Sequence, residues 1–356
     1  MRGGGFARPP RRMDGIAVTN TKPKISALRF FLFTVFTVAG FAAAIIANVT
    51  VRQAAVKVKI LPYEIGSVTL DFNGLYRLVL LGLILVFIGM ATYAFFDEDR
   101  RAKFIKRAPF RFALGIALAA WDILGTKYLL LPQPFFPGPA QILEAFLLEP
   151  AFILENTLYS LRLFLVGFVG GVLFGVGTGI LIGWFPKMYY WVHPVLKLTG
   201  VIPAVAWMPF ALTLAPTPFI AAALLMVLCA LFPIASLTAQ GVQSTAKVHF
   251  EVAKTLGANT AQLVFRVAIP HAMPQIFTGI GTANGFMFTT LVMAEMMGQP
   301  GGLGYYINLS RVWSQYYKVF AAIIIMAILF SIILQVVSLI QRRVLRWQKG
   351  LVKQNG

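Results

Sequence analysis

Long runs of apolar residues, separated by short polar segments, fill most of this chain after its first 26 residues. Each run is long enough to cross a bilayer as a helix, because about 20 residues span the hydrocarbon core. We therefore predict an all-α fold, a polytopic transmembrane helical bundle with about eight spans. The predicted spans cover about residues 28–49, 74–96, 112–131, 157–184, 191–213, 217–238, 272–297 and 319–341.

The fifth predicted span contains two prolines, Pro203 and Pro209. Proline removes a backbone donor and clashes with the preceding turn of a helix. This span is therefore expected to be kinked or broken. Only a tight proline-containing turn, at residues 215–218, separates it from the sixth span.

The polar segments predict four parts of the chain. Residues 1–26 are rich in Gly, Pro and Arg, which is typical of a disordered basic tail. Residues 27–111 form an N-terminal extension with two spans, the first of which is too long for a signal peptide and is predicted to be an uncleaved anchor. Residues 112–347 form the main transmembrane domain, and 348–356 form a second basic tail. The charged stretch 97–111 is the predicted module boundary.

Composition excludes a soluble globular protein. Of the 356 residues, 58% are hydrophobic and only 12% are charged, and the mean hydropathy is +0.78. The net charge of +19 raises the alternative of a nucleic-acid-binding membrane protein, but that alternative rests only on the basic termini.

Basic residues are distributed unevenly between the two sides of the predicted spans. One side carries 22 Lys and Arg residues, and the other carries five. The segments on the basic side are 1–29, 97–111, 185–190, 239–271 and 342–356. Cytoplasmic loops of membrane proteins carry the excess of Lys and Arg. We therefore predict a multi-pass membrane protein with both termini and the 251–270 loop in the cytoplasm.

The chain shows no constellation for chemistry on a substrate. It has no G-x-x-x-x-G-K-[ST] phosphate-binding loop, and its three histidines are too scattered to suggest a metal site. The single cysteine, Cys229, lies within an apolar run and is interpreted as a packing residue. We predict that this chain is not an enzyme and binds no cofactor or metal itself.

The most informative polar segment is the loop at 245–270, between the sixth and seventh spans. It contains a short helical pattern that turns at Gly257 and runs nine residues to a Val-x-Ile-Pro stop. Glycine allows the positive φ that joins two short helices. The positions that carry the pattern are Glu251, Ala253, Gly257, Val267, Ile269 and Pro270.

This segment resembles the cytoplasmic coupling loop of ABC-importer permeases, whose motif reads Glu-Ala-Ala, three residues, Gly, nine residues, Ile-x-Leu-Pro. Val252, Val267 and Ile269 depart from it conservatively. Glu251 is interpreted either as complementing the N-terminus of its helix or as pairing with a basic residue of the ATPase. An ordinary amphipathic helix between two spans is the alternative interpretation of the whole segment.

From about residue 112 to 347 the chain looks like the nitrate/sulfonate/taurine-type permeases of bacterial ABC importers. The supporting segments are Phe136-Pro137-Gly138-Pro139, residues 202–209, residues 294–298 and residues 302–307. The resemblance implies a six-helix permease core, so the two leading helices are an addition. It also implies three kinds of partner: ATPase subunits that bind ATP and Mg, an extracytoplasmic solute-binding protein, and a second permease copy in a homodimer or heterodimer.

Glycine recurs every fourth residue along the predicted fourth span. A spacing of four keeps these residues close to one helix face, where they allow another helix to approach closely. Packing within the subunit and packing at a dimer seam are both open. The glycines are Gly167, Gly171, Gly175, Gly179 and Gly183.

Two acidic residues, Asp122 and Glu295, are predicted to lie within spans, where charged side chains are costly and usually functional. The resemblance implies that they serve gating or structural hydrogen bonds, with direct contact to the solute as the alternative. For the apolar candidates, packing alone is the alternative interpretation. The predicted translocation path comprises Asp122, Pro203, Trp207, Met208, Met293 and Glu295.

The resemblance implies import of a small anion or polar organic molecule, such as a sulfonate, nitrate, bicarbonate or a pyrimidine precursor. Two alternatives remain open at this point. One is a permease for a quaternary amine or an amino acid. The other is a channel or carrier that works without ATP.

Overall fold

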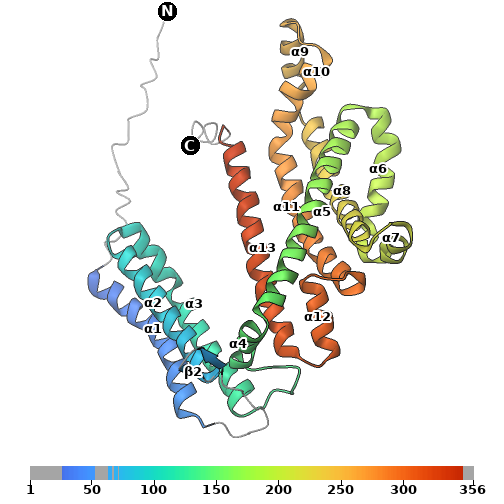
Figure 1. Cartoon of the computed structure of the whole chain (residues 1–356). Helices are drawn as coiled ribbons and strands as arrows, with labels where there is room; N and C mark the ends of the chain where they lie inside the picture. The colour runs from blue at the N-terminus through green and yellow to red at the C-terminus, as the bar shows by residue number, and fades with distance from the viewer. Residues whose placement is uncertain (1–25, 53–62, 66–67, 71, 348–356) are drawn as a thin grey trace, which may run out of the picture. The chain divides into compact units, whose positions relative to one another are not determined.

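The structure is a computed structural model that describes residues 26–52, 63–65, 68–70 and 72–347 (Figure 1). The predicted tails at 1–26 and 348–356 lie outside these residues, apart from Ser26. The chain divides into two compact units. One comprises Met1–Arg52 and Arg77–Ala120, and the other comprises Gln53–Tyr76 and Trp121–Gly356. Residue 111, the predicted module boundary, lies inside a helix.

Seven helices in the described residues are long and apolar enough to cross a membrane. A bent pair of shorter helices makes an eighth span, so the predicted all-α bundle of about eight spans is confirmed. The seven long helices are α1 (Ala27–Thr50), α2 (Phe72–Phe95), α3 (Glu98–Asp122), α5 (Pro150–Trp184), α8 (Pro218–Gln243), α11 (Ile269–Gly298) and α13 (Tyr316–Val344).

The eighth span is broken as its prolines predicted. Helix α6 (Pro186–Val201) ends before Pro203, and a 3-10 turn (Ala204–Trp207) leads into α7 (Met208–Leu214). The two halves are bent by 98° to one another. Pro203 cannot donate a backbone hydrogen bond to α6, and Pro209 occupies the first turn of α7, where a missing donor costs nothing.

Helix α3 begins much earlier than the predicted third span. The span was predicted to start at about residue 112, but the helix starts at Glu98 and includes the charged stretch. Hydropathy detects only the apolar half of such a helix. The charged half is amphipathic: Phe104 and Ala108 are buried on one face, and Lys103 and Arg107 are exposed on the other.

Within the first unit, α1 and α3 approach one another at backbone distance. A β-carbon on Gly40 would lie 2.6 Å from the carbonyl oxygen of Phe112. The rings of Phe36 and Phe112 stack beside this contact, with centroids 4.2 Å apart. Arg111 is only 8% exposed, and its guanidinium lies 4.4 Å from the centroid of the Phe104 ring. Cation–π contact therefore replaces water around this buried charge.

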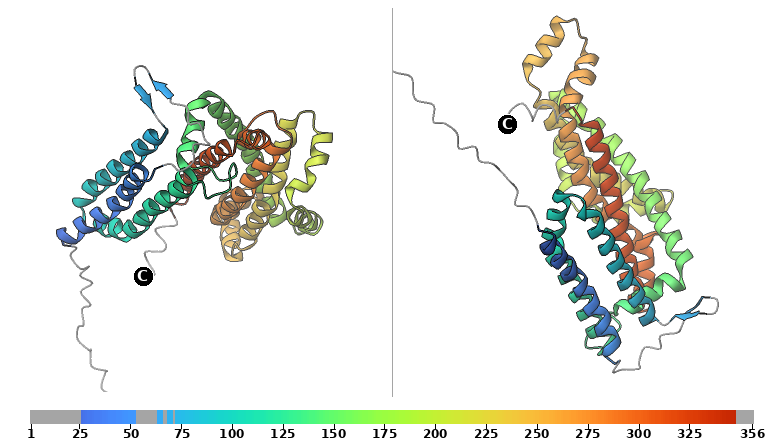
Figure 2. Two further views of the ribbon diagram at one scale, coloured as in Figure 1. Left: turned by 90° about the horizontal axis from the view of Figure 1, so that it is seen from below. Right: turned by 90° about the vertical axis from the view of Figure 1, so that its left-hand side faces the viewer.

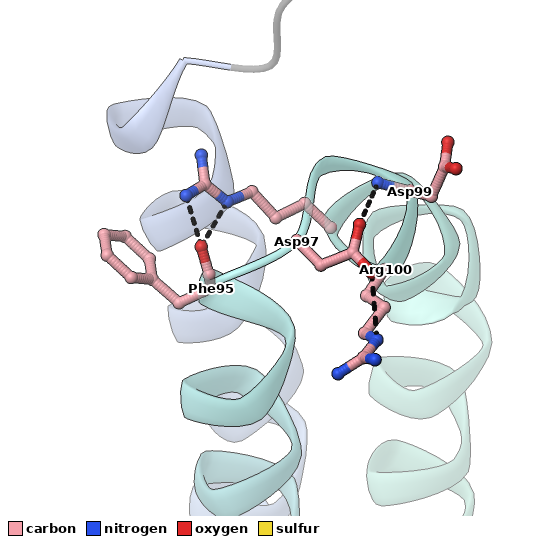
Figure 3. A network of polar contacts seen from close by, with 5 residues as sticks. Phe95, Asp97, Asp99 and Arg100 are labelled. Carbon is pink, nitrogen blue, oxygen red and sulfur yellow. Dashed lines mark hydrogen bonds and ion pairs between the residues drawn. The ribbon is translucent and has the colours of Figure 1, made fainter.

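A short turn joins α2 to α3 (Figure 3). The side chain of Asp97 accepts a hydrogen bond from the backbone N–H of Asp99 at 3.0 Å. The same carboxylate pairs with Arg100 at 3.0 Å. Asp97 thus caps α3, and its negative charge lies at the positive end of the helix dipole.

In the second unit, α5, α8 and α11 lie side by side and form the main core (Figures 1 and 2). Large buried side chains at their contacts include Phe164, Met226 and Met287. The shorter elements of this unit are α4 (Pro139–Leu148), α9 (Lys247–Thr255), α10 (Thr260–Gln262), α12 (Leu303–Val312), and the antiparallel strands β1 (Tyr63–Ile65) and β2 (Val68–Leu70).

The repeated glycines of α5 face α8 of the same chain. A β-carbon at any of the five positions would lie 2.5–2.8 Å from a side-chain atom of α8. The α8 residues they face also recur every fourth position, so the two helices stay in register along five turns. In sequence order these residues are Met226, Ala230, Ile234, Thr238 and Val242.

Candidate functional site

The segment between α8 and α11 projects beyond the ends of the long helices of its unit. Figures 1 and 2 both show α9 and α10 standing clear of the bundle at the end where α11 begins. Helix α9 is followed by a tight turn, α10, and a π-helical turn (Leu263–Ala268) that leads directly into α11. A displacement of α9 would therefore act directly on α11.

Gly257 ends α9 in a Schellman motif. Its φ is +82°, as its sequence position predicted. The N–H of Gly257 donates to the carbonyl of Lys254 at 2.9 Å, and the N–H of Ala258 donates to the carbonyl of Ala253 at 3.0 Å. These two bonds satisfy carbonyls that the helix end leaves free. Asn259 and Gln262 then exchange side-chain-to-backbone bonds of 2.9 Å in a capping box.

Apolar side chains on α9 and the following turns point away from the protein. Val248, Val252 and Leu256 recur every fourth residue and therefore share a face of the helix. Leu256 is 83% exposed, and Val248, Val252 and Phe265 are all more than half exposed. An exposed apolar stripe on a helix that projects beyond the long helices of its unit is typical of a protein-binding surface.

The opposite side of the segment is fixed to the bundle. The ring of Phe250 lies edge-on to Trp184 at the end of α5, with centroids 5.6 Å apart. Leu263 and Ala268 are buried against the core. Ala253, Val267 and Ile269 are half-buried, whereas Glu251, Gly257 and Pro270 are exposed, so the predicted positions are divided between the inner and outer sides of the segment.

Glu251 does not occupy the N-terminus of its helix. Helix α9 begins at Lys247, four residues earlier, so the interpretation of Glu251 as a dipole partner at the helix start is wrong. The prediction failed because it placed the helix start at the acid. The carboxylate is exposed in the middle of α9, beside the apolar stripe.

A cavity of about 570 Å³ lies where α6 breaks, between α6, α8 and α11. Its polar lining consists of neutral groups, and among the described residues around it none carries a charge. The hydroxyl of Ser236 has no hydrogen-bond partner in the protein, unlike that of Thr282, which donates to the carbonyl of Thr278. The polar lining residues are Thr199, Cys229, Ser236, Gln240 and Thr282.

The predicted path residues do not converge on one place. Pro203 lines the cavity through the helix break. Met208 and Met293 both line a separate gap beside Thr290, which is too narrow to hold a water molecule. Trp207 lies next to Met208 in the 3-10 turn, and its indole N–H is buried without a partner in the protein.

Glu295 belongs to the last turns of α11, and its carboxylate lies against the N-terminus of α12 and not in the cavity. It is 1% exposed, and its Oε2 accepts a hydrogen bond from the N–H of Gly304 at 2.8 Å. The N–H groups of Gly302 and Leu303 donate to Asn156 at 2.9 Å and Ser160 at 2.8 Å. Side chains of α5 and α11 thus satisfy the free donors of α12. This is a structural hydrogen-bond role.

Asp122, the other acid, is fully buried at the end of α3. It precedes a π-helical turn (Ile123–Lys127) in which Lys127 is also buried. Trp121, beside it, donates its indole N–H to the carbonyl of Pro137 at 3.0 Å. Like Glu295, Asp122 is absent from the lining of the cavity.

A second polar cluster links α4, α12 and α13. Glu149 and Lys318 form an ion pair at 2.5 Å, and the hydroxyl of Tyr306 donates to Glu149 at 3.3 Å. Burial, and then the neighbouring Glu149, raise the pKa of the Tyr306 hydroxyl, so it remains a donor. The sequence does not reveal this cluster, because its members are far apart along the chain.

The cavity residues Ser236 and Gln240 were also missed. They are one helical turn apart within an apolar run, and polar residues at that spacing inside a span are the signal that could have identified them. Cys229, interpreted as a packing residue, lines the same cavity and accepts a hydrogen bond from Thr290 at 3.3 Å.

Residues 171–347 match the family described as binding-protein-dependent transport system inner membrane component. The taurine transport system permease protein TauC of Escherichia coli (strain K12) is 30% identical over 241 residues, which are 66% of this chain and 87% of that protein. The nitrate import permease protein NrtB of Synechocystis sp. is 28% identical over 251 residues, which are 67% of this chain and 87% of that protein.

A chain from the inward-facing MetNI methionine ABC transporter aligns with 55% of this chain and 98% of its own length. Its sequence identity is 22% and its TM-score is 0.47.

Proposed function

The chain belongs to the family of binding-protein-dependent transport system inner membrane components, and from this premise we propose how it works as the permease subunit of a bacterial ABC importer. The segment 245–270 is the surface that a separate ATPase subunit binds. The observation that carries this proposal is the exposed apolar stripe of Val248, Val252 and Leu256 on a helix fixed to α11.

The proposed mechanism is mechanical. ATP and Mg bind to the partner ATPase, and closure of the ATPase dimer displaces α9. Because α9 continues through two short turns into α11, and Phe250 holds it against α5, the displacement reaches both core helices. Packed helices switch between discrete arrangements instead of deforming continuously. The bundle would thereby alternate between inward-facing and outward-facing states.

The proposed solute path includes the 570 Å³ cavity at the break of α6. Hydroxyl and amide groups, supplied by Ser236, Gln240 and Thr282, line it in place of charges. Such groups bind a polar solute weakly, and weak binding allows release. TauC and NrtB are a taurine and a nitrate permease by name, so we propose a small oxyanion or zwitterion, such as a sulfonate or nitrate, as the cargo.

We further propose the orientation and the partners. The excess of Lys and Arg on one side supports a topology with both termini and the 245–270 segment in the cytoplasm. A second permease copy completes the path, and an extracytoplasmic binding protein delivers the solute. Residues 112–347 form the permease core, with coupling through Glu251, Ala253, Gly257, Val267, Ile269 and Pro270 and the residues of the apolar stripe.

The test is the substitution Leu256→Glu in the assembled transporter. The side chain is 83% exposed, so the permease itself should fold and insert normally. Forcing an unpaired carboxylate into an apolar interface should weaken ATPase binding by on the order of 2 kcal/mol. The measurements are co-purification of the ATPase and solute uptake.

Leu256→Met is the matched control, since it keeps an apolar side chain of similar size. It should retain both ATPase binding and uptake. Full co-purification and uptake in Leu256→Glu would show that the ATPase binds elsewhere. Uptake by the permease reconstituted without any ATPase would instead establish an ATP-independent carrier.

A further inference from the structure

A groove of about 270 Å³ runs along the first unit, between the first turns of α1 and the last turns of α2. Among the residues that the structure describes, its polar lining side chains are two threonines. Thr34 donates to the carbonyl of Phe30 at 3.0 Å, and Thr92 donates to that of Gly89 at 2.8 Å. Both hydroxyls are therefore satisfied within their own helices. The groove offers hydrocarbon surface alone, from Ala27, Phe30, Phe31, Ile88, Ala91, Phe95 and Phe96.

Arg101 is held at the end of this groove. Its Nε donates to the carbonyl oxygen of Phe95 at 2.7 Å, and its Nη2 donates to the same oxygen. The guanidinium also lies 4.6 Å from the centroid of the Phe95 ring, which lines the groove. An arginine carries five N–H donors. Arg101 therefore keeps donors for an anion at the mouth of an apolar groove.

The charges around Arg101 favour an anion. The nearest acid in the turn, Asp97, pairs with Arg100 and caps α3 (Figure 3). Glu98 and Asp99 are exposed at the start of α3. They are outnumbered by exposed basic side chains further along α3 and in the first turn of α1: Arg29, Lys103, Lys106 and Arg107.

We propose that this groove binds one acyl chain of an anionic diacyl phospholipid, whose phosphate is bound by Arg101. Basic pockets between transmembrane helices bind anionic head groups on the cytoplasmic side. The end of the unit that holds Arg101 is the side that the positive-inside rule assigns to the cytoplasm. The proposal depends on the first unit alone, and not on the transport mechanism.

The dimensions of the groove favour a lipid chain over a helix from a partner protein. An α-helix with side chains is about 10–12 Å wide. A volume of 270 Å³ between two neighbouring helices accommodates part of a hydrocarbon chain, whereas a helix could enter it only with single side chains. The N–H groups of Arg101 that do not bind Phe95 can donate to an anionic oxygen close to that chain, which a phospholipid supplies in one molecule.

The experiment measures lipid binding to the delipidated full transporter by native mass spectrometry. The probes are palmitoyl-oleoyl phosphatidylglycerol, which is anionic, and palmitoyl-oleoyl phosphatidylethanolamine, which is zwitterionic. The wild type should bind phosphatidylglycerol preferentially. Arg101→Gln should weaken this binding about fivefold, the effect of losing one arginine near an anionic lipid. Thr92→Trp should reduce it further, because the indole would occupy the groove.

Two control variants match these changes. Lys187→Gln removes one exposed positive charge from the start of α6, in the second unit, and Thr50→Trp adds an indole at the far end of α1. Both should bind phosphatidylglycerol like the wild type. Equal binding of the two lipids by the wild type would overturn the proposal. So would unchanged phosphatidylglycerol binding in both Arg101→Gln and Thr92→Trp, or a cross-link from Thr92→Cys to a partner helix.

Discussion

At the scale of single residues, Gly302 determines how α12 is attached to the core. Its φ is +108°, a conformation that side chains other than glycine rarely adopt. This turn directs three successive N–H groups, from Gly302 to Gly304, at side chains of α5 and α11. Glu295, one of these acceptors, also places its carboxylate at the positive end of the α12 dipole.

We expect Gly302→Ala to destabilise the permease. The left-handed backbone alone costs about 1–3 kcal/mol for a residue with a side chain, and the added β-carbon would meet the carboxylate of Glu295. Thermal unfolding of the purified protein measures the loss. Gly281→Ala, at a position in α11 where a β-carbon meets open space, should unfold like the wild type. Equal stability of the two variants would contradict this account of the turn.

At the scale of elements, α5 and α8 are joined by matched periods. Glycines every fourth residue on α5 face side chains every fourth residue on α8, from Met226 to Val242. Lipid tails are as apolar as leucine, so burial does not drive helices together within a membrane. Close backbone approach, with the dispersion contacts that it allows, is what holds this pair together.

Gly175→Ala and Gly177→Ala form a direct test of this contact. A β-carbon at Gly175 would lie 2.8 Å from the β-carbon of Ile234, whereas one at Gly177 meets open space. We expect Gly175→Ala to destabilise the protein by about 1–3 kcal/mol, the range for overpacking. Gly177→Ala should be neutral or slightly stabilising, because alanine favours helix. Both are measured by thermal unfolding, and the reverse order would reject the α5–α8 contact.

At the scale of the second unit as a whole, the cavity and the projecting segment share the same two helices. Ser236 on α8 and Thr282 on α11 line the cavity, and the 245–270 segment connects the ends of α8 and α11. A force applied to α9 therefore acts on the helices that form the cavity walls. This connection links the proposed ATPase surface to the proposed solute path.

Cys229 offers a native reporter of that connection. It is the only cysteine of the chain, and it lines the cavity. In the assembled transporter, trapping the ATPase with ATP and vanadate should slow modification of Cys229 by a small water-soluble thiol reagent severalfold. The physical reason is that repacking of α8 against α11 would close the cavity to the cytoplasm. Equal rates of Cys229 modification with and without trapping would show that the cavity does not change during the ATPase cycle.

Several local features followed from the sequence because their causes are local. Pro203 breaks the fifth span, because a proline has no backbone N–H to donate in any tertiary context. Gly257 takes positive φ where the helical pattern ends. The start of α3 did not follow, because its amphipathic first half buries Phe104 against other helices and shows no hydropathy peak.

The sequence by itself determined the all-α class, the spans and the position of the projecting segment, because each depends on hydropathy or on residues next to one another. Tertiary structure alone decided which polar groups share a site. Glu295 was a candidate for the path, yet it binds Gly304 outside the cavity, while Ser236, Gln240 and Thr282 come together on two helices. Those groupings depend on how each helix is rotated about its axis and on its register against its neighbours. Both are determined by packing between segments that are distant in the sequence.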